Sequence, residues 1–491
     1  MTDASSARLR ELAAAMDGTL VLPTDDDWAE ASRAWNLAFV QRPAAVATPA
    51  NVADVHLVLA AARDAGLGVT VQASGHGPHG SDLRDCILIR PWAFDELTID
   101  VERRTARVGA GVQWGRVLDA LEGTGLVGLA GSNPTINVVG YMLGGGHSSL
   151  GRAFGLAAHS LLAVELVTAD GTFARVADAE SDAELLWALK GGGGQFGVVT
   201  AMEFRLYPAP TAGMLYGGKL TFPAAVASPV LRAVVDVAAS APELVSISAV
   251  MMVLPDLPMV PEPLRGQQII TVDIVSMLSA AVTEALIEPI RAAGPVVADT
   301  VGEFTIGALP EVFAEPVDPV PALEWSGMIG ALDHAAVAAL VGAFVEGAAL
   351  GLSLLQVRPL GGALGRAVNA PAVAGVAGVL VSDALVGAAG FVFDPAMAPS
   401  VTAAMKTVQD AAAPHTVHGR VVTFLAPGED LGAAYGHAEI ARLRAVKQRV
   451  DPEGRFNRGK LLPGGDLRDA YTPSFNLLGH ESLIMQQSDI N

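Results

Sequence analysis

The sequence VQASGHGPHG (residues 71–80) places two histidines, His76 and His79, in a run of small residues that follows a short apolar stretch. An imidazole can act as a nucleophile, a general base, a metal ligand or a plain hydrogen-bonding group. This pair and the pair His415 and His418 both have HxxH spacing, but neither is accompanied by a cysteine pair or by a glutamate at a zinc-site spacing. We therefore predict no metal site.

Three glycine-rich segments are the strongest local signals: SGHGPHG (74–80), NPTINVVGYMLGGGHSSLG (133–151) and KGGGGQFGVVT (190–200). Backbone amides without neighbouring side chains can approach a pyrophosphate closely and hydrogen-bond to it without lysine or arginine. Any one of these segments alone could be a tight turn. Together they indicate a ligand that contains a diphosphate.

Two further motifs match the patterns of other enzyme classes only in part. GAGVQWG (109–115) stands between a predicted strand and a predicted helix, but its spacing is GxGxxxG instead of the dinucleotide GxGxxG, and no parallel βαβ pattern surrounds it. A tight turn is the favoured interpretation. The alternative, a nicotinamide dehydrogenase, predicts NADH binding and no yellow colour. GHSSLG (146–151) has Leu150 where the serine-hydrolase motif GxSxG needs glycine.

The apolar pattern predicts the elements that position these segments. Residues 48–66 form an amphipathic helix with Thr48 as N-cap and Pro49 at its first position. Residues 161–176 form a hairpin and residues 197–208 a strand. From residue 211 onward, longer alternations of strand-like and helical sequence predict a second domain, a mixed sheet with covering helices.

Composition excludes several partners. The chain has 51 acidic and 31 basic residues, a net charge of -20, which repels nucleic acid and anionic membrane surfaces. The single cysteine, Cys86, excludes an intrachain disulfide and fits a reducing compartment. The apolar stretch 374–393 has Asp383 near its centre, so we predict two buried strands there and no membrane span. The N-terminus lacks a continuous apolar signal region, and we expect a cytoplasmic protein.

Several segments occur in a fixed order, among them VTVQASGHG (69–77), TARVGAGVQWGRVLDAL (105–121), GSNPTINVVGYMLGGG (131–146) and LLWALKGGGGQFGVVT (185–200). In this order they resemble the FAD-linked oxidases of the vanillyl-alcohol oxidase (PCMH-type) superfamily, specifically its berberine-bridge-enzyme-like branch. The resemblance is close over about residues 40–210 and weaker toward the C-terminus, where it includes RLRAVKQRVDPEGRF.

The resemblance implies an α+β fold with a two-lobed PCMH-type FAD-binding domain over residues 40–210. A substrate domain over residues 211–420 would contain an antiparallel sheet covered by helices. Residues 1–39 would form an N-terminal helical segment, residues 421–470 would return to the FAD domain, and residues 471–491 would form a tail.

The resemblance also implies FAD as the cofactor, with His76 attached to the 8α-methyl group of the isoalloxazine. A nitrogen of imidazole is a competent nucleophile near neutral pH, and the glycines let the methyl group approach. The alternative is a dissociable FAD beside a hydrogen-bonding histidine. Bicovalent members have a cysteine where this chain has Asn133, so a second linkage is not expected. The residues expected to bind FAD are Ser74, Gly75, His76, Gly77, Pro78, His79, Gly80, Asn133, Pro134, Thr135, Gly140, Tyr141, Gly144, Gly145, Val199 and Asn457.

The implied reaction is hydride transfer from a small-molecule substrate to flavin N5, with loss of a hydroxyl or amine proton, followed by reoxidation by dioxygen or another acceptor. The family's tyrosine-asparagine-tyrosine-like stretch is replaced by VVTFLAPGED (421–430), which leaves the catalytic base open. Tyr141, His147 and Tyr435 are candidates by residue type, whereas His437 is expected on the solvated start of a helix.

The predicted substrate domain is rich in Ala, Val, Leu and Gly, which favours a moderately apolar alcohol or amine as the substrate. The alternative function is a flavin-carrying protein that uses its pocket for non-redox cyclisation or ligand binding. The sequence gives no prediction of the oligomeric state.

Overall fold

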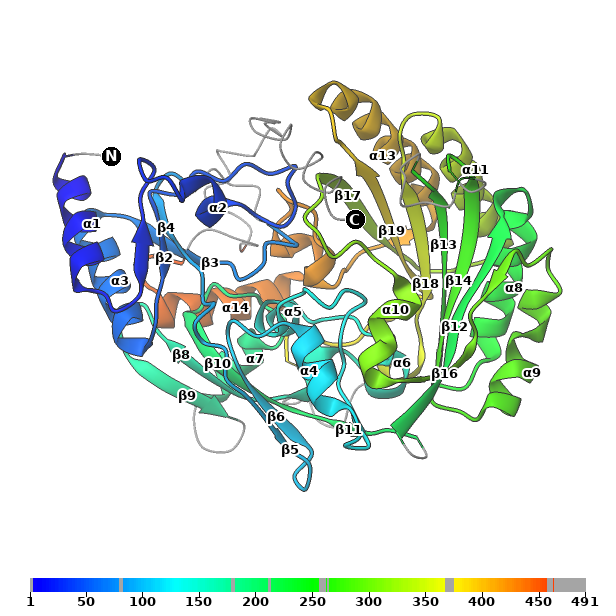
Figure 1. The fold of residues 1–491 in the computed structure, drawn as a ribbon, viewed down its shortest axis with the longest axis horizontal. Helices are drawn as coiled ribbons and strands as arrows, with labels where there is room; N and C mark the ends of the chain where they lie inside the picture. Colours follow the sequence, from blue (N-terminus) through cyan, green and yellow to red (C-terminus); the bar gives the residue numbers. More distant parts are fainter. Residues whose placement is uncertain are drawn as a thin grey trace.

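The computed structural model describes residues 3–78, 83–177, 182–210, 213–255, 262, 265–366, 375–456 and 462. Two lobes lie side by side (Figure 1). The first lobe contains a four-stranded and a five-stranded sheet, and the second contains one large sheet. The α+β fold class predicted from the sequence is confirmed.

The four-stranded sheet of the first lobe carries the first glycine loop. Its strands lie in the order β1 (Thr19–Val21), β2 (Ala45–Thr48), β4 (Cys86–Ile89) and β3 (Gly68–Val71), and β2 and β3 run parallel to β4. Helices α1 (Asp3–Ala15) and α3 (Val52–Ala65) contribute to its apolar core. Because β1 is part of this sheet, the predicted division at residue 39 separates one strand from its neighbours.

The predicted start of the α3 helix was wrong by three residues. Thr48 is the last residue of β2, where it pairs with Thr19. Asn51 is the N-cap, because its side-chain oxygen accepts a hydrogen bond from the backbone N–H of Asp54.

The five-stranded sheet is antiparallel, with the order β5 (Leu97–Asp100), β6 (Thr105–Gly109), β10 (Val198–Arg205), β8 (Leu161–Val167) and β9 (Phe173–Ala177). The β8–β9 hairpin and β10 occur where they were predicted. Both neighbours of β6 are antiparallel to it, so the glycine turn after β6 is not part of a parallel βαβ unit, which argues against the nicotinamide alternative. The helices of this part are α4 (Trp114–Leu121), α5 (Val138–Leu143), α6 (Gly151–Phe154) and α7 (Ala183–Leu189).

The sheet of the second lobe is antiparallel and has nine strands in the described part of the chain. The order is β15 (Ala298–Asp299), β12 (Met214–Pro223), β14 (Gln268–Ser276), β13 (Val245–Val253), β18 (Leu354–Pro359), β19 (Ala384–Phe391), β17 (Ala322–Ile329) and β20 (Thr416–Val417), while β16 (Gly302–Thr305) also pairs with β12. Helices α8 (Ala227–Ser240), α9 (Ala280–Arg291), α11 (His334–Ala348) and α13 (Ala398–Ala412) cover the face turned away from the first lobe (Figure 1).

The described residues of the apolar stretch 374–393 form one strand, β19, so the prediction of two strands was wrong. The carboxylate of Asp383 accepts the N–H of Leu332, and the N–H of Asp383 donates to the carbonyl of Ile329, so the chain turns into the sheet at this residue. No helix in the described ranges is long and apolar enough to cross a membrane.

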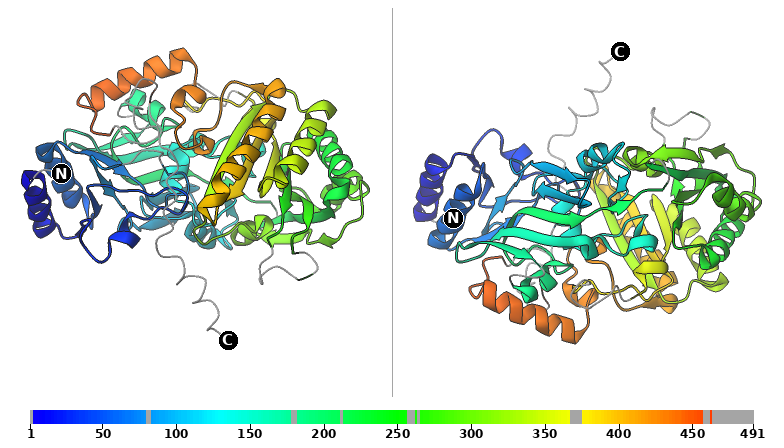
Figure 2. Two further views of the ribbon diagram at one scale, coloured as in Figure 1. Left: turned by 90° about the horizontal axis from the view of Figure 1, so that it is seen from above. Right: turned by 90° about the horizontal axis from the view of Figure 1, so that it is seen from below.

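The chain returns to the first lobe after the second. Helix α14 (His437–Val450) lies against the first lobe (Figure 2). Its Lys447 ammonium bonds to the carbonyls of Gln195 (2.6 Å) and Phe456 (2.8 Å) and pairs with Asp451 (2.6 Å). We keep the predicted domain limits as a proposal, with β1 added to the FAD domain.

Two buried polar side chains fasten the lobes together. The amide of Asn36 donates to the carbonyl of Ala322 (2.9 Å) and accepts from its N–H (3.0 Å). Arg152, from α6, donates to the carbonyls of Val245 (2.8 Å), Ala241 (2.9 Å) and Leu360. Because these contacts are buried, removing either side chain would leave backbone groups at the contact unpaired, at a cost of about 1–3 kcal/mol each.

Candidate functional site

A cavity of about 470 Å³ lies between the two lobes. One wall is formed by parts of all three glycine-rich segments, and the opposite wall by the inner face of the large sheet. This volume falls in the range of small-molecule and cofactor sites. The glycine segments predicted from the sequence are therefore brought together at one cavity.

His76 lies at the first glycine loop, which follows β3. Its ring stacks on Trp35, with ring centroids 3.9 Å apart and an interplanar angle of 18°. The indole N–H of Trp35 donates to the carbonyl of Val317 (3.0 Å), which fixes the stacking partner. Gly75 has φ +81°, and a Cβ there would lie 2.9 Å from Ala34, so the loop requires glycine at this position.

A hydrogen-bond chain determines which nitrogen of His76 carries the proton. The Asn133 amide N–H donates to the carbonyl of Pro316 (2.7 Å), which turns its oxygen toward Thr135. That oxygen accepts both the N–H (2.9 Å) and the O–H (2.7 Å) of Thr135. With its only proton donated, the Thr135 hydroxyl must accept from Nε2–H of His76, 2.8 Å away.

His76 Nδ1 therefore carries the lone pair. Burial lowers the pKa of His76 to about 4, so the ring is neutral at pH 7. A neutral imidazole with one nitrogen committed to a hydrogen bond and the other unprotonated can act as a nucleophile.

The residues of the cavity wall fit FAD. A Cβ built on Gly193 meets nothing within 4 Å, and one on Gly194 meets only Leu143 at 4.0 Å, so this backbone is open to a ligand. The buried hydroxyl of Thr423, also at the wall, has no hydrogen-bond partner in the described part of the chain. An elongated ligand with polar groups would satisfy it.

The structure brings most of the predicted FAD-binding residues to the cavity. Those at its wall are Ser74, Gly75, His76, Gly77, Asn133, Gly140, Tyr141, Gly144 and Val199. Thr135 does not line the cavity but lies behind His76, to which its hydroxyl is hydrogen-bonded. Pro78, Pro134 and Gly145 are not at the wall. His79, Gly80 and Asn457 fall outside the described residues.

The structure separates the predicted base candidates. Tyr141 and His147 line the cavity, but Tyr435 does not: its hydroxyl donates to the carbonyl of Gly191 (2.7 Å). Burial raises the pKa of Tyr141 above its ordinary value, so its phenol is a proton donor. Burial, together with the charge of Arg358, lowers the pKa of His147 to about 3, which makes it a weak base. His437 is exposed at the start of α14, as expected.

Residues 421–430 border the cavity but supply no tyrosine. The Thr423 N–H donates to the carbonyl of Gly144 (3.0 Å), and the Ser326 hydroxyl donates to the carbonyl of Phe424 (2.6 Å), so the segment is held between both lobes. The Phe424 ring lies 5.0 Å from the guanidinium carbon of Arg358.

The inner face of the sheet adds residues that the sequence analysis did not identify. Successive side chains of a strand point to opposite faces, so alternate residues of β17, β18 and β19 line the cavity. Among them are Glu324, Ser326, Leu354, Gln356, Arg358, Gly387 and Ala389. Gly387 pairs with Ser326 on one side and Gln356 on the other. A Cβ on Gly387 meets nothing within 4 Å, so the floor of the cavity is open at this point.

Comparison with known proteins agrees with this geometry. Residues 43–177 match the family model of an FAD binding domain. The structure superimposes on a variant of BBE-like 1 from Physcomitrella patens with a TM-score of 0.79, at 21% identity, over 93% of this chain and 99% of that one. The chain therefore contains an FAD binding domain, and its fold is similar to that of this BBE-like protein.

The proteins to which the chain is similar differ in the substrates that their names give. (R)-6-Hydroxynicotine oxidase of Paenarthrobacter nicotinovorans is 33% identical over 196 residues, 40% of this chain and 43% of that protein. The xylooligosaccharide oxidase of Myceliophthora thermophila C1, in complex with xylobiose, superimposes with a TM-score of 0.76 at 19% identity, over 94% of this chain and 99% of that one. The sequence match therefore spans less than half of the curated relative.

Proposed function

We propose that this protein is an FAD-dependent oxidoreductase that carries FAD on His76 and oxidises a small alcohol or amine by hydride transfer to flavin N5. The observation that supports this most strongly is the neutral His76, with Nδ1 unprotonated, at the glycine wall of a cavity whose opposite wall is a sheet face with polar and apolar side chains. The names of the relatives, which include oxidases, agree with it.

FAD, when bound, supplies the hydride acceptor and passes electrons to dioxygen or another acceptor. The glycine segments would hold it by backbone contacts, and Nδ1 of His76 would be the attachment point for the 8α carbon. Attachment would replace one C–H bond of the methyl group, release its proton to water and pass two electrons to the acceptor. Thr135 keeps Nε2 protonated in the unattached ring, so Nδ1 is the nitrogen available for attachment.

Glu324 is the proposed proton acceptor for the substrate. The carboxylates at the wall of the cavity, among the described residues, are Glu315 and Glu324. Glu324 lies on the sheet floor, paired with Ala389 and next to the open position at Gly387. Because Tyr141 is a donor and His147 a weak base, a carboxylate on the floor suits removal of a hydroxyl or amine proton best.

The test begins with the visible spectrum of the purified protein before and after acid precipitation. Yellow colour in the pellet, absent from His76→Ala, is the expected result for covalent FAD. Colour that moves to the supernatant would contradict the linkage alone, and a colourless protein would contradict the flavin proposal.

An anaerobic titration with alcohols and amines then tests the reaction. Bleaching of the flavin band by a substrate is the expected result. A ligand-induced spectral shift without bleaching by any compound would favour the non-redox alternative instead.

A further inference from the structure

Arg358 is a cation at the cavity wall that the proposed reaction does not use. It comes from β18 and borders both the large cavity and a small polar pocket of about 40 Å³ next to it. Within the described residues it forms no ion pair or hydrogen bond, and its contact is with the face of the Phe424 ring. Its guanidinium donors therefore remain available to a ligand in the cavity.

The nearby acids Glu315 and Asp273 favour the charged form of Arg358 but form no ion pair with it in the described part of the chain. Asp273, which affects the pKa of Arg358, forms its own ion pair with Lys219 at 2.7 Å. Glu315 also affects that pKa but does not form an ion pair with Arg358. Burial lowers the pKa of Arg358, which reflects the cost of holding a cation away from water. A ligand anion would offset this cost.

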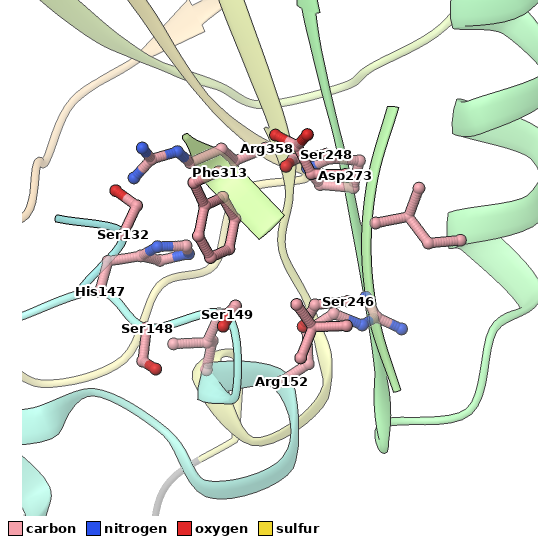
Figure 3. A pocket seen from close by; sticks show the side chains of 14 residues that line it. Ser132, His147, Ser148, Ser149, Arg152, Ser246, Ser248, Asp273, Phe313 and Arg358 are labelled. Carbon is pink, nitrogen blue, oxygen red and sulfur yellow. The ribbon is translucent and has the colours of Figure 1, made fainter. Parts of the chain in front are cut away.

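Further donors lie near the guanidinium. The close-up shows the Arg358 side chain running away from Asp273 toward Ser132 and His147, which border both spaces (Figure 3). The Tyr141 hydroxyl is buried without a partner in the described residues, and Tyr141 and Arg358 each influence the pKa of the other. A guanidinium fork and a phenol donor match the two oxygens of a carboxylate.

We propose that Arg358, together with the Tyr141 hydroxyl, binds a carboxylate of the substrate. This inference rests on the proposed function and narrows its substrate class to alcohols or amines that carry a carboxylate. The reacting carbon would then lie over the sheet floor between Gly387 and Glu324, while the anionic end faces Arg358. The small polar pocket behind Arg358 has room for ordered water, which would solvate the far side of the ion pair.

Calorimetric titration of the purified protein with benzoate and with its neutral isostere benzamide tests the carboxylate site. We expect benzoate to bind more tightly than benzamide, and Arg358→Met to weaken benzoate about tenfold to a hundredfold while leaving benzamide unchanged. Arg358→Lys keeps the charge without the fork and should give an intermediate loss. Tyr141→Phe, which removes one hydroxyl, should weaken benzoate by a smaller factor.

Glu315→Gln supplies a test of opposite sign. It removes a negative charge that faces the same cavity, so benzoate should bind more tightly than to the wild type. Arg103→Met is the matched control, because the Arg103 side chain is exposed on a turn, and it should bind benzoate as the wild type does.

Equal affinity for benzoate and benzamide, or wild-type benzoate affinity in Arg358→Met, would overturn the inference. A changed flavin midpoint potential with unchanged benzoate affinity in Arg358→Met would assign Arg358 to the flavin ring and overturn it as well. The flavin content of each preparation is read separately from its spectrum. Failure of the proposed function, a protein without flavin, is therefore distinguishable from failure of the carboxylate site.

Discussion

The Thr135 hydroxyl oxygen lies 2.8 Å from Nε2 of His76 and 2.7 Å from the side-chain oxygen of Asn133. Asn133 stands where the family resemblance indicates a second attachment cysteine in bicovalent members, and here it orients Thr135 toward the proposed attachment residue, His76. Its amide also bonds to Pro316 of the chain leading to β17. The protonation of His76 is thus set by residues that are distant in sequence.

Thr135→Val should slow the covalent attachment of FAD. The valine has a similar shape but neither accepts from His76 nor donates to Asn133, so His76 no longer has one preferred tautomer. We expect an attachment rate about fivefold to tenfold lower, from the loss of one buried hydrogen bond. The measurement is the acid-stable flavin in timed samples after FAD is added to protein prepared without it.

Thr135→Ser is the matched control for this prediction, because it retains the hydroxyl and should attach FAD at nearly the wild-type rate. If Thr135→Val attached FAD as fast as Thr135→Ser, the hydrogen-bond chain would have no role in attachment.

The first lobe could be predicted from sequence in more detail than the second. Its glycine segments carry local signals, since backbone positions such as Gly75 admit no side chain. The inner sheet face carries no comparable signal. Glu324, Gln356 and Arg358 lie on two strands that become neighbours of β19 only in the folded sheet. The alternation in LLQVRP indicates that Gln356 and Arg358 share a face, but only the folded structure shows that this face lies opposite the glycine segments.

One helix boundary was wrong and one base candidate lies away from the cavity because tertiary contacts outweigh local preference. Thr48 was a suitable N-cap by residue type, but its pairing with Thr19 extended β2 and moved the cap to Asn51. Tyr435 was a suitable base by residue type, but its hydroxyl is committed to the carbonyl of Gly191. In both cases a tertiary partner decided between alternatives that the sequence permitted.

The protein should lose stability as the pH falls from about 6.5 to about 4, in part through His159. Burial lowers the pKa of His159 to about 4 from the ordinary 6.5. Its Nε2–H donates to the carbonyl of Gly378 (2.9 Å), and its Nδ1 accepts the N–H of Leu156 (3.3 Å), so the folded protein needs the neutral ring. In this pH window the unfolded chain binds the proton and the folded protein does not. The free energy of unfolding therefore decreases as the pH decreases.

His159→Gln tests this contribution, because glutamine can donate to Gly378 and accept from Leu156 without titrating. Urea unfolding gives the decrease in the free energy of unfolding between pH 7 and pH 4.5. This decrease should be smaller in the variant than in the wild type, by up to roughly 3 kcal/mol. A substitution of the exposed His437 is the control. Identical losses in wild type and His159→Gln would contradict the assignment.

Glu324→Gln should lower the rate of flavin reduction without loss of FAD. The amide cannot accept the substrate proton, and a positioned general base contributes about 10²- to 10⁴-fold. Anaerobic stopped-flow absorbance measures this rate directly.

Tyr435→Phe is the comparison variant for the base. Its flavin should be reduced by substrate at the wild-type rate. The variant should lose about 1 kcal/mol of stability, since the Tyr435 hydroxyl that it lacks bonds only to Gly191 among the described residues. Slow flavin reduction in Tyr435→Phe together with wild-type flavin reduction in Glu324→Gln would make Tyr435, and not Glu324, the proton acceptor.

Gly387→Val and Gly390→Val should affect different properties, although both lie on β19: the first should change substrate range and the second should lower stability. The two positions point to opposite faces of the sheet. A Cβ at Gly390 would lie 2.4 Å from the side chain of Val401 on α13, so valine there overpacks the core and should cost about 1–3 kcal/mol or more. A Cβ at Gly387 meets nothing within 4 Å, so Gly387→Val should fold with nearly wild-type stability.

The added side chain of Gly387→Val instead occupies the floor of the substrate cavity. Among substrates that reduce the wild-type flavin, kcat/KM should fall about tenfold to a hundredfold for the bulkiest and change little for the smallest. Thermal unfolding and a substrate series on both variants give the two readouts. Loss of kcat/KM for large and small substrates alike would place the reacting carbon directly above Gly387, whereas an unchanged profile would place the substrate elsewhere in the cavity.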